Sequence, residues 1–543
     1  MNPIDISRRA FLKMAGLAGA SLALPRWVVG QNATSSSEKT PARPGRRFEV
    51  IGSIYPWDVQ GEGIEVVLDN LTSLAGVNTI YLISLMHKEY RPKTSIQFPH
   101  NPIRPHWNAE DSCIYFHSHL ELYGRIKPAI SQYEWLSSTD WLKVVIDAAR
   151  ARGLKVGAEI SHTPIPSSVC VSNPEFMQCD VNGKQNPKSL HRACPNHPDV
   201  REYLLALFGD LADNYQLDYI QTCMYLYSAD ACFCRSCQRE AQAAGFDLAA
   251  AIPVLKANPK AQPQLNQWLD FKRKTNARIY RLVAERIHKA KGRPEFRVNG
   301  CYYGKKEDHT SGLYIEDVRG VIDSNLIPDH TEQNGKAKED FSVKKAWLAR
   351  NRSLLGPETT VVSSVAVRPK ATPDLVRKGV ELVVKGGGDG VHGAHYDCAT
   401  FSLLRAMREG LAAAGVKGFI PVRGVEAGKM TLTNWVRETY LDEACIRASS
   451  GATAVSKFAF PSGSYDIIVS YAGIKDEPGF LALSVAGSEK LAWKWDPGLG
   501  TWKRKVIPQV TLQSGEEINL TGSPGAHVEF VEFVEHEAGA KPS

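Results

Sequence analysis

The sequence predicts an α/β protein: a (β/α)8 TIM barrel followed by a small all-β sandwich of jelly-roll type. From residue 47 onward, short β-branched and aromatic runs alternate eight times with longer amphipathic patterns, as in a barrel of βα units. After residue 418 the pattern changes to short alternating strands separated by Gly, Ser and Pro, which is typical of a β-sandwich. A chain of 543 residues is also too long for one hydrophobic core.

The barrel strands are expected at eight places along the chain. In order they are 48–55, 79–85, 155–160, 219–224, 297–302, 326–330, 360–365 and 390–395. Amphipathic helices are expected between them, including 141–152, 198–215, 268–289 and 373–385. The alternative is a doubly wound open sheet, but the Gly-x-Gly-x-x-Gly turn typical of that fold does not follow the first strand.

The N-terminus has the features of an export signal. The pair Arg8-Arg9 precedes a short apolar stretch at 14–24, which is the twin-arginine pattern. We therefore expect a signal peptide at 1–30, a flexible Ser/Thr/Pro-rich linker at 31–46, the barrel at 47–418 and the β-sandwich at 419–543. The mature protein is expected to be periplasmic or secreted, with no stable membrane span after signal removal. The alternative is that the apolar stretch stays uncleaved as an anchor.

Composition excludes one class of partner. The formal charge is +7, and no Lys/Arg stripe interleaved with aromatic residues accompanies it, so nucleic acid is not expected as a partner. The sequence leaves the oligomeric state open.

The most specific local pattern is Cys232-Phe-Cys234-Arg-Ser-Cys237. Three thiols so close in sequence cannot all pair in disulfides of good geometry, but they can converge on a tetrahedral metal ion. Cys194 is expected as the fourth ligand, and a site closed by four thiolates would hold structural Zn²⁺. Cys170, Cys179 and Cys223 are alternatives for the fourth ligand, and disulfides or free thiols are the alternative for the whole cluster.

A family resemblance rests on these residues. The segments Cys194-Pro-Asn-His-Pro, Leu217-Asp-Tyr-Ile220 and Cys232–Cys237 resemble the family 42 β-galactosidases and related barrel hydrolases, over roughly residues 190–275. The resemblance implies zinc binding by Cys194, Cys232, Cys234 and Cys237. It also implies a glycoside hydrolase acting on a poly- or oligosaccharide. That family carries a catalytic Asn-Glu pair at the end of strand 4, where this chain reads 221-QTCMYLYSAD-230, so β-galactosidase activity is not expected.

The C-terminal region carries a second resemblance. The order of Val425-Glu-Ala, Gly463–Tyr471 and Trp493-Lys-Trp495 resembles the family 6 and family 35 carbohydrate-binding modules. Trp493, Trp495 and Trp502 are either stacking platforms for sugar rings or residues that pack the sandwich against the barrel.

Candidate site residues follow the carboxyl ends of the predicted strands, where barrel enzymes hold their active sites. Glycoside hydrolysis needs two carboxyl groups. We expect an acid from the loop after strand 6, Glu332 or Asp329, and a partner from Asp397 or Glu159. Aromatic and imidazole side chains suited to binding sugar are Trp57, His87, His162, Tyr225, Tyr227, Tyr302, His330 and His395. The alternatives are a non-catalytic carbohydrate-binding barrel and a metal-dependent lyase or deacetylase.

Overall fold

The computed structural model describes most of the chain from residue 47 to residue 536. The described ranges are 47–87, 97–109, 111–162, 164–186, 193–224, 226–300, 314–328, 341–365, 367, 371–393, 395–495 and 500–536. The expected signal and linker lie outside these ranges, as do five predicted site residues: Tyr225, Tyr302, Asp329, His330 and Glu332. Within the described ranges, no helix combines the length and apolar character needed to cross a bilayer.

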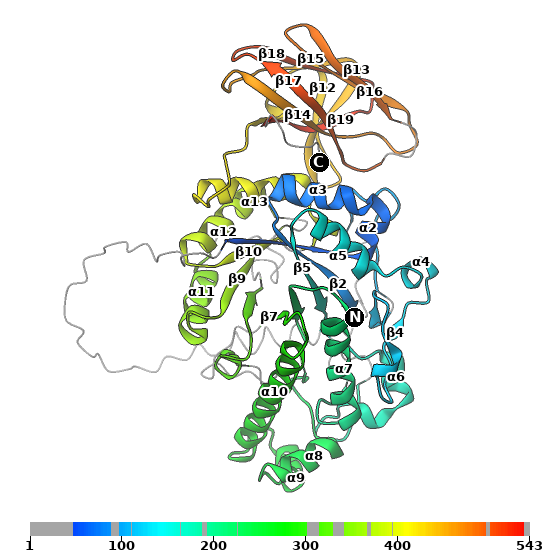
Figure 1. Ribbon diagram of the computed structural model, residues 1–543, viewed down its shortest axis with the longest axis vertical. Coiled ribbons are helices and arrows are strands. Elements are labelled where there is room, and N and C mark those ends of the chain that lie inside the picture. The colour runs from blue at the N-terminus through cyan, green and yellow to red at the C-terminus, as the bar shows by residue number, and fades with distance from the viewer. Residues whose placement is uncertain are drawn as a thin grey trace, which may run out of the picture. The chain divides into compact units, whose positions relative to one another are not determined.

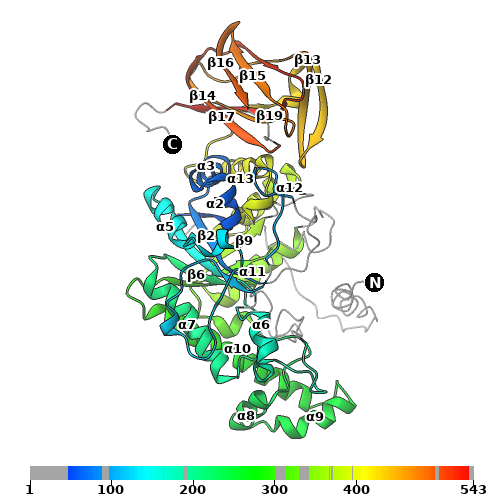
Figure 2. The same ribbon diagram turned by 90° about the vertical axis from the view of Figure 1, so that its right-hand side faces the viewer.

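The predicted barrel is confirmed. Eight parallel strands close on themselves, because β1 pairs with both β2 and β10 (Figures 1 and 2). The barrel strands are β1 (Glu49–Ile54), β2 (Thr79–Met86), β5 (Lys155–Ile160), β6 (Tyr219–Thr222), β7 (Glu295–Asn299), β8 (Ser324–Ile327), β9 (Thr360–Val365) and β10 (Gly390–Gly393). Two short strands, β3 (Cys113–Ile114) and β4 (Ala129–Ile130), extend the sheet beside β2.

Helices surround the barrel strands, as Figure 1 shows. They are α2 (Pro56–Glu62), α3 (Ile64–Ala75), α4 (Glu134–Ser137), α5 (Trp141–Ala151), α6 (Ser167–Ser172), α7 (Pro198–Asn214), α8 (Arg235–Ala243), α9 (Leu248–Ala257), α10 (Gln264–His288), α11 (Ser342–Leu355), α12 (Pro373–Lys385) and α13 (Phe401–Ala413). The expected helix at 373–385 matches α12, which Thr372 caps by accepting a hydrogen bond from the Leu375 N–H.

Several strands end earlier than the apolar patterns predict. Strand 5 was expected at 297–302, but β7 ends at Asn299, because Gly300 has a φ of +98° and cannot continue an extended strand. Strand 8 was expected to reach residue 395, but His395 lies at φ +60°. Apolar and aromatic residues occur both in a strand and in the connection that follows it, so periodicity alone does not specify where a strand ends.

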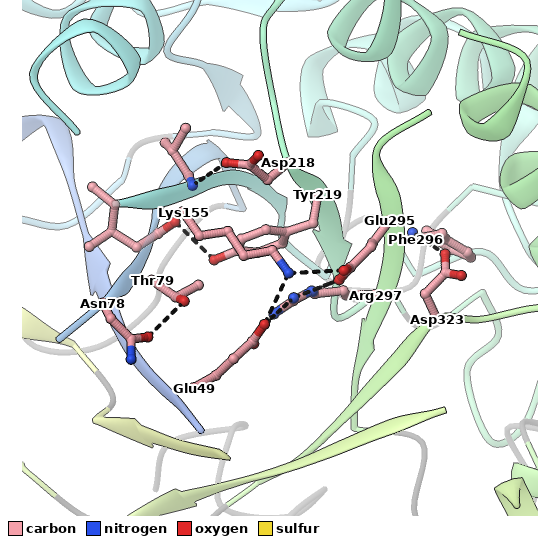
Figure 3. A network of polar contacts seen from close by, with 12 residues as sticks. Glu49, Asn78, Thr79, Lys155, Asp218, Tyr219, Glu295, Phe296, Arg297 and Asp323 are labelled. Atoms are coloured by element: carbon pink, nitrogen blue, oxygen red, sulfur yellow. Dashed lines mark hydrogen bonds and ion pairs between the residues drawn. The ribbon is translucent and has the colours of Figure 1, made fainter. Parts of the chain in front are cut away.

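The amino ends of the barrel strands share one capping arrangement, part of which Figure 3 shows. An Asn or Asp directly precedes each of β2, β6, β8 and β10, and its side chain accepts a hydrogen bond from the backbone N–H at the start of the preceding barrel strand. The pairs are Asn78 with Val50, Asp218 with Val156, Asp323 with Phe296, and Asp389 with Val361, at 2.8–3.1 Å. The arrangement repeats every two strands and gives these backbone groups a partner.

A cluster of charged side chains lies at the amino end of the barrel strands. Arg297 is buried, with only 2% of its side chain exposed, and it contacts Glu49 and Glu295, while Lys155 bridges the same two carboxylates (Figure 3). The guanidinium also lies 4.0 Å from the ring centroid of Tyr219. Burial alone would raise the pKa of Glu49, but the charges of Arg297 and Lys155 outweigh it and lower that pKa to about 2.

Replacing Glu49 by Gln is expected to destabilise the fold by about 3 kcal/mol at neutral pH, because the buried Arg297 loses one of its two carboxylate partners. The folded-state pKa of Glu49 is depressed, so its stabilisation is present above the ordinary pKa near 4.5 and is lost as pH falls toward 2. Unfolding midpoints measured from pH 7 to pH 3 should therefore converge for parent and variant at the acid end. Asp147→Asn, in the exposed pair with Lys143, should match the parent throughout.

The C-terminal region is an antiparallel all-β domain, as expected. Its strands are β11 (Gly424–Glu426), β12 (Thr431–Tyr440), β13 (Glu443–Lys457), β14 (Gly463–Ala472), β15 (Gly479–Val485), β16 (Ser488–Trp495), β17 (Lys503–Leu512), β18 (Glu517–Gly522) and β19 (His527–Glu535). The long strand β13 pairs with β19 near its start and with β18 near its end, which connects the two parts of the sheet.

The three tryptophans of this domain that were candidate stacking platforms are packing residues. Trp493 and Trp495 are 7% and 8% exposed and belong to the core of the β domain. Trp502 is 2% exposed and packs with the barrel core, and its backbone N–H donates to the Pro99 carbonyl. We therefore assign none of the three as an exposed platform for sugar rings.

The barrel and the β domain lie in one compact unit and contact each other through polar groups. Arg405 of α13 bonds Glu426, Ser402 bonds Glu443, and Arg504 of β17 donates to Asn70 of α3. Because these contacts bury charged groups of both parts, the β domain is expected to be fixed on the barrel rather than loosely tethered.

Candidate functional site

Asp397 lies at the carboxyl end of the barrel, next to the indole ring of Trp57. It belongs to the short helical turn η4 (Tyr396–Cys398) after β10, and its Oδ2 accepts a hydrogen bond from the Trp57 indole at 3.3 Å. The Trp57 ring stacks on Tyr55, with centroids 4.4 Å apart. The Tyr55 hydroxyl lies 2.6 Å from Nδ1 of His395. One carboxylate is thus combined with an indole, a phenol and an imidazole from the ends of β1 and β10.

His395 is held in an unusual backbone conformation. Its φ is +60°, in the left-handed region, where a residue with a Cβ is rarely found unless its surroundings impose it. The surroundings are the Ser53 hydroxyl, which accepts from the His395 N–H at 2.8 Å, and the bond to Tyr55. Such locally strained residues concentrate at functional sites, where the fold maintains them.

Two further carboxyl groups lie behind Asp397 on the helix α2. Asp58 is fully buried, and burial followed by the charges of Asp397 and Glu62 raises its pKa well above the ordinary range. The buried surroundings therefore favour the protonated form of Asp58 next to Asp397. Its Oδ2 accepts from the Tyr55 N–H at 2.8 Å.

Glu62 pairs with a buried histidine, His100. Its Oε1 lies 2.7 Å from Nδ1 of His100, whose Nε2 faces the Ala399 carbonyl at 3.0 Å. Burial opposes the charge on His100, but Glu62 outweighs it and raises the pKa of the imidazole. The Tyr396 hydroxyl donates to the other oxygen of Glu62, which fixes the turn that carries Asp397.

Glu159, on β5, lies inside the barrel in a second polar group. It is 4% exposed and accepts hydrogen bonds from Gln221, from the Cys223 thiol at 3.5 Å and from Tyr81. Burial raises its pKa despite these donors. Tyr81 also contacts Nε2 of His392 at 2.9 Å, so the network crosses the barrel from β5 to β10.

Two predicted histidines lie beside this network. Nδ1 of His87 is 2.6 Å from the Ser161 hydroxyl, and the His87 and His162 rings are 4.7 Å apart. Nδ1 of His162 faces the Cys223 carbonyl at 3.0 Å, and burial lowers the pKa of this imidazole. His162 is therefore neutral near pH 7 and suited to hydrogen bonding rather than to carrying charge.

The four cysteines expected to bind metal converge. The sulfur atoms of Cys194, Cys232, Cys234 and Cys237 all lie within 4.8 Å of one another, and Cys194 is 3.4 Å from both Cys234 and Cys237. A tetrahedral Zn²⁺ with bonds of about 2.3 Å needs sulfur atoms about 3.8 Å apart, which this cluster accommodates. Cys194, Cys232, Cys234 and Cys237 form no disulfide, so the disulfide alternative is not seen for this cluster.

The surroundings of the thiols also suit a metal site. Asn196 donates to the Cys237 sulfur at 3.4 Å and to the Tyr227 hydroxyl at 2.8 Å. The Lys272 ammonium lies 4.3 Å from the centroid of Trp268, and burial lowers its pKa to about 7. Four thiolates around a divalent cation carry net negative charge, which a nearby ammonium and amide donors stabilise.

The structure separates the described candidate residues into three groups. Trp57, His395 and Asp397 lie together, Glu159 lies with His162 and His87, and Tyr227 is buried at the thiol cluster, where no sugar would reach it. Sequence reasoning did not single out Glu62, His100, Gln221 and Tyr81. A signal for Glu62 was present, because it follows Asp58 by four residues on a helix. His100 has no comparable signal, since only the fold brings its loop to α2.

A scan against protein-family models finds no match, nor does a search of curated proteins. Among solved structures, the chain is similar to a cycloisomaltooligosaccharide glucanotransferase of Paenibacillus sp., with 12% identity, a TM-score of 0.34 and coverage of 90% of this chain and 58% of that chain. It is also similar to alpha-L-fucosidase isoenzyme 2 from Paenibacillus thiaminolyticus, with 14% identity, a TM-score of 0.45 and coverage of 70% and 51%.

A shorter similarity is to a family 35 carbohydrate-binding module from Clostridium thermocellum, with 21% identity, a TM-score of 0.19 and coverage of 21% of this chain and 97% of that one. The chain spans only 58% and 51% of the lengths of the two larger structures.

Proposed function

We propose that this protein is a glycoside hydrolase that cleaves a poly- or oligosaccharide at the carboxyl end of its barrel. The observation that carries the proposal is the setting of Asp397, which is 8% exposed, bonded to an indole and close to the buried Asp58, whose pKa it helps to raise. Aromatic faces pack on the apolar faces of sugar rings, and a carboxyl group beside them can attack the sugar as a carboxylate or protonate the glycosidic oxygen as a carboxylic acid.

Within this proposal, Asp397 supplies one carboxyl group of the catalytic pair. Its partner comes from the loop after β8, where Glu332 and Asp329 are the candidates. Glu159 is the alternative partner, but its oxygens already accept three hydrogen bonds, which suits a residue that positions Gln221 and Tyr81. His395 and Tyr55 would then orient sugar hydroxyl groups beside Asp397.

We further propose that the thiol cluster holds structural Zn²⁺. Four sulfur ligands leave no open coordination position, so the ion would stabilise the segments around α8 and supply no step of the reaction.

Export through the twin-arginine pathway is part of the same proposal. That route carries folded proteins, so the thiols could bind metal in the reducing cytoplasm before export.

A screen for sugar release tests the proposal. The protein, with its metal bound, is incubated with aryl glycosides and with neutral and acidic oligosaccharides, and new reducing ends are measured. Release from at least one substrate class supports a hydrolase. Binding without release from any substrate would instead favour a non-catalytic carbohydrate-binding barrel, which the absence of an Asn-Glu pair at the end of β6 makes the specific alternative.

A further inference from the structure

Three aromatic side chains outside the site described above form a surface cluster next to it. Trp107, Tyr133 and Trp135 come from the connection between β2 and α5. The Trp107 ring lies 5.1 Å from Tyr133 and 5.0 Å from Trp135, centroid to centroid. Tyr133 is 40% exposed, and both tryptophans are partly exposed. Trp107 also lies 6.4 Å from Trp57, so the rings run without interruption from Asp397 to the surface.

Arg104 lies on this cluster, and no acidic side chain among the described residues pairs with it. Its guanidinium carbon is 3.8 Å from the ring centroid of Trp135 and 5.5 Å from that of Trp107. Over the ranges that the structure describes, the guanidinium forms no hydrogen bond or ion pair, and its Nε is buried without a partner. Burial is the cause that lowers its pKa, with no nearby carboxylate acting on it. Arg125, by contrast, pairs with Glu175 and Asp199.

The position of Arg104 is fixed relative to the barrel site. The Asn101 side chain is buried, and its oxygen accepts hydrogen bonds from the N–H groups of Ile103 and Arg104 at 3.0 and 2.9 Å. Its Nδ2 donates to the Trp57 carbonyl at 2.8 Å. Gly61 permits this contact, because a Cβ there would lie 2.2 Å from the Asn101 oxygen. One buried amide therefore ties the turn of Arg104 to the residue that bonds Asp397.

We propose that Arg104, with Trp107, Tyr133 and Trp135, forms a subsite for an anionic sugar of the bound chain. The aromatic faces would pack against the pyranose ring. The planar guanidinium can stack on an aromatic ring while its N–H groups remain available as donors. Two of these N–H groups can donate in parallel to two oxygens of a carboxylate or a sulfate group. This inference rests on the proposed function and makes its substrate class specific: an oligosaccharide carrying uronate or sulfate groups, with one such group a short distance along the chain from the scissile bond.

Binding measured by calorimetry tests the inference independently of turnover. Asp397→Asn protein is titrated with oligogalacturonates, with sulfated galactan oligosaccharides and with neutral galacto- and xylo-oligosaccharides, before and after adding Arg104→Gln. Loss of a charge-assisted bond is expected to weaken binding of the anionic ligand about tenfold or more, and leave neutral ligands unchanged. The uronate and sulfate arms identify which anion is recognised. Trp135→Ala should weaken binding of both anionic and neutral chains.

Arg437→Gln, an exposed arginine of β12, is the matched control and should leave every affinity unchanged. Thermal midpoints confirm that the variants are folded. Equal affinity of parent and Arg104→Gln for every anionic ligand would overturn the subsite, as would a parent that binds only neutral chains. If the subsite is overturned in this way but neutral chains are still bound or cleaved, the proposed hydrolase function stands without an anionic subsite. If no glycan of any kind is bound or cleaved, the proposed function fails as well.

Discussion

Replacing Asp397 by Asn is expected to lower kcat on the best substrate about a thousandfold, with KM changed only a few-fold. The amide has nearly the same shape and can still accept the Trp57 hydrogen bond, but it can neither attack a sugar nor exchange a proton. Burial is the main cause that raises the pKa of Asp58, and the charge of Asp397 only adds to it, so the substitution leaves the main cause in place. Initial rates over a range of substrate concentrations give both constants.

Two further variants make this result specific. Asp374→Asn, 73% exposed on α12, should keep the parent kcat. In Asp397→Ala, added azide or formate should restore part of the activity, because a small anion can occupy the space of the missing carboxylate. A kcat for Asp397→Asn close to that of the parent would remove Asp397 from the catalytic pair.

The second large effect is expected at the thiol cluster. Cys237→Ser should lose the bound metal and destabilise the segment from Cys194 to α8, because a structural metal site contributes its binding free energy, on the order of several kcal/mol, to folding. Metal content by mass spectrometry should fall from one equivalent of zinc to near zero. Limited proteolysis should then cut first near α8. The catalytic site should be affected only through this loss of stability.

A buried cysteine outside the cluster separates metal loss from the effect of burying a hydroxyl group. Cys445, 4% exposed in the β domain, is the matched position, and Cys445→Ser should keep full metal content. Reconstitution with cobalt(II) should give the visible absorption of a tetrahedral thiolate site in the parent and in Cys445→Ser only. A parent protein that folds fully without metal, or that contains disulfides among these cysteines, would refute the metal site.

The fold was predictable because it follows local patterns. Alternating apolar runs and amphipathic helices identified all eight barrel strands, and the spacing of Cys232, Cys234 and Cys237 identified a cluster that Cys194 completes. Tyr227 shows the limit of this reasoning. It follows a barrel strand closely, as a site residue would, but the chain turns its hydroxyl into the thiol cluster. Position after a strand specifies an end of the barrel and not the direction of a side chain.

The parts of the site that depend on tertiary contacts could not be predicted. His100 pairs with Glu62, and Arg104 stacks on Trp135, across connections whose path no sequence pattern specifies. The raised pKa of Asp58 also depends on burial and on the charge of Asp397, which lies more than three hundred residues away in sequence. Electrostatic environments of this kind arise only once the strands have closed.

Cleavage in water labelled with oxygen-18 tests the central proposal most directly. The parent protein digests the substrate identified by the screen, and the products are weighed by mass spectrometry, with unlabelled product incubated alone to correct for exchange. A glycoside hydrolase must place one labelled oxygen at each new reducing end. Products that carry no label and contain an unsaturated sugar would mean elimination rather than hydrolysis, and would contradict the assignment of Asp397 to a hydrolytic pair.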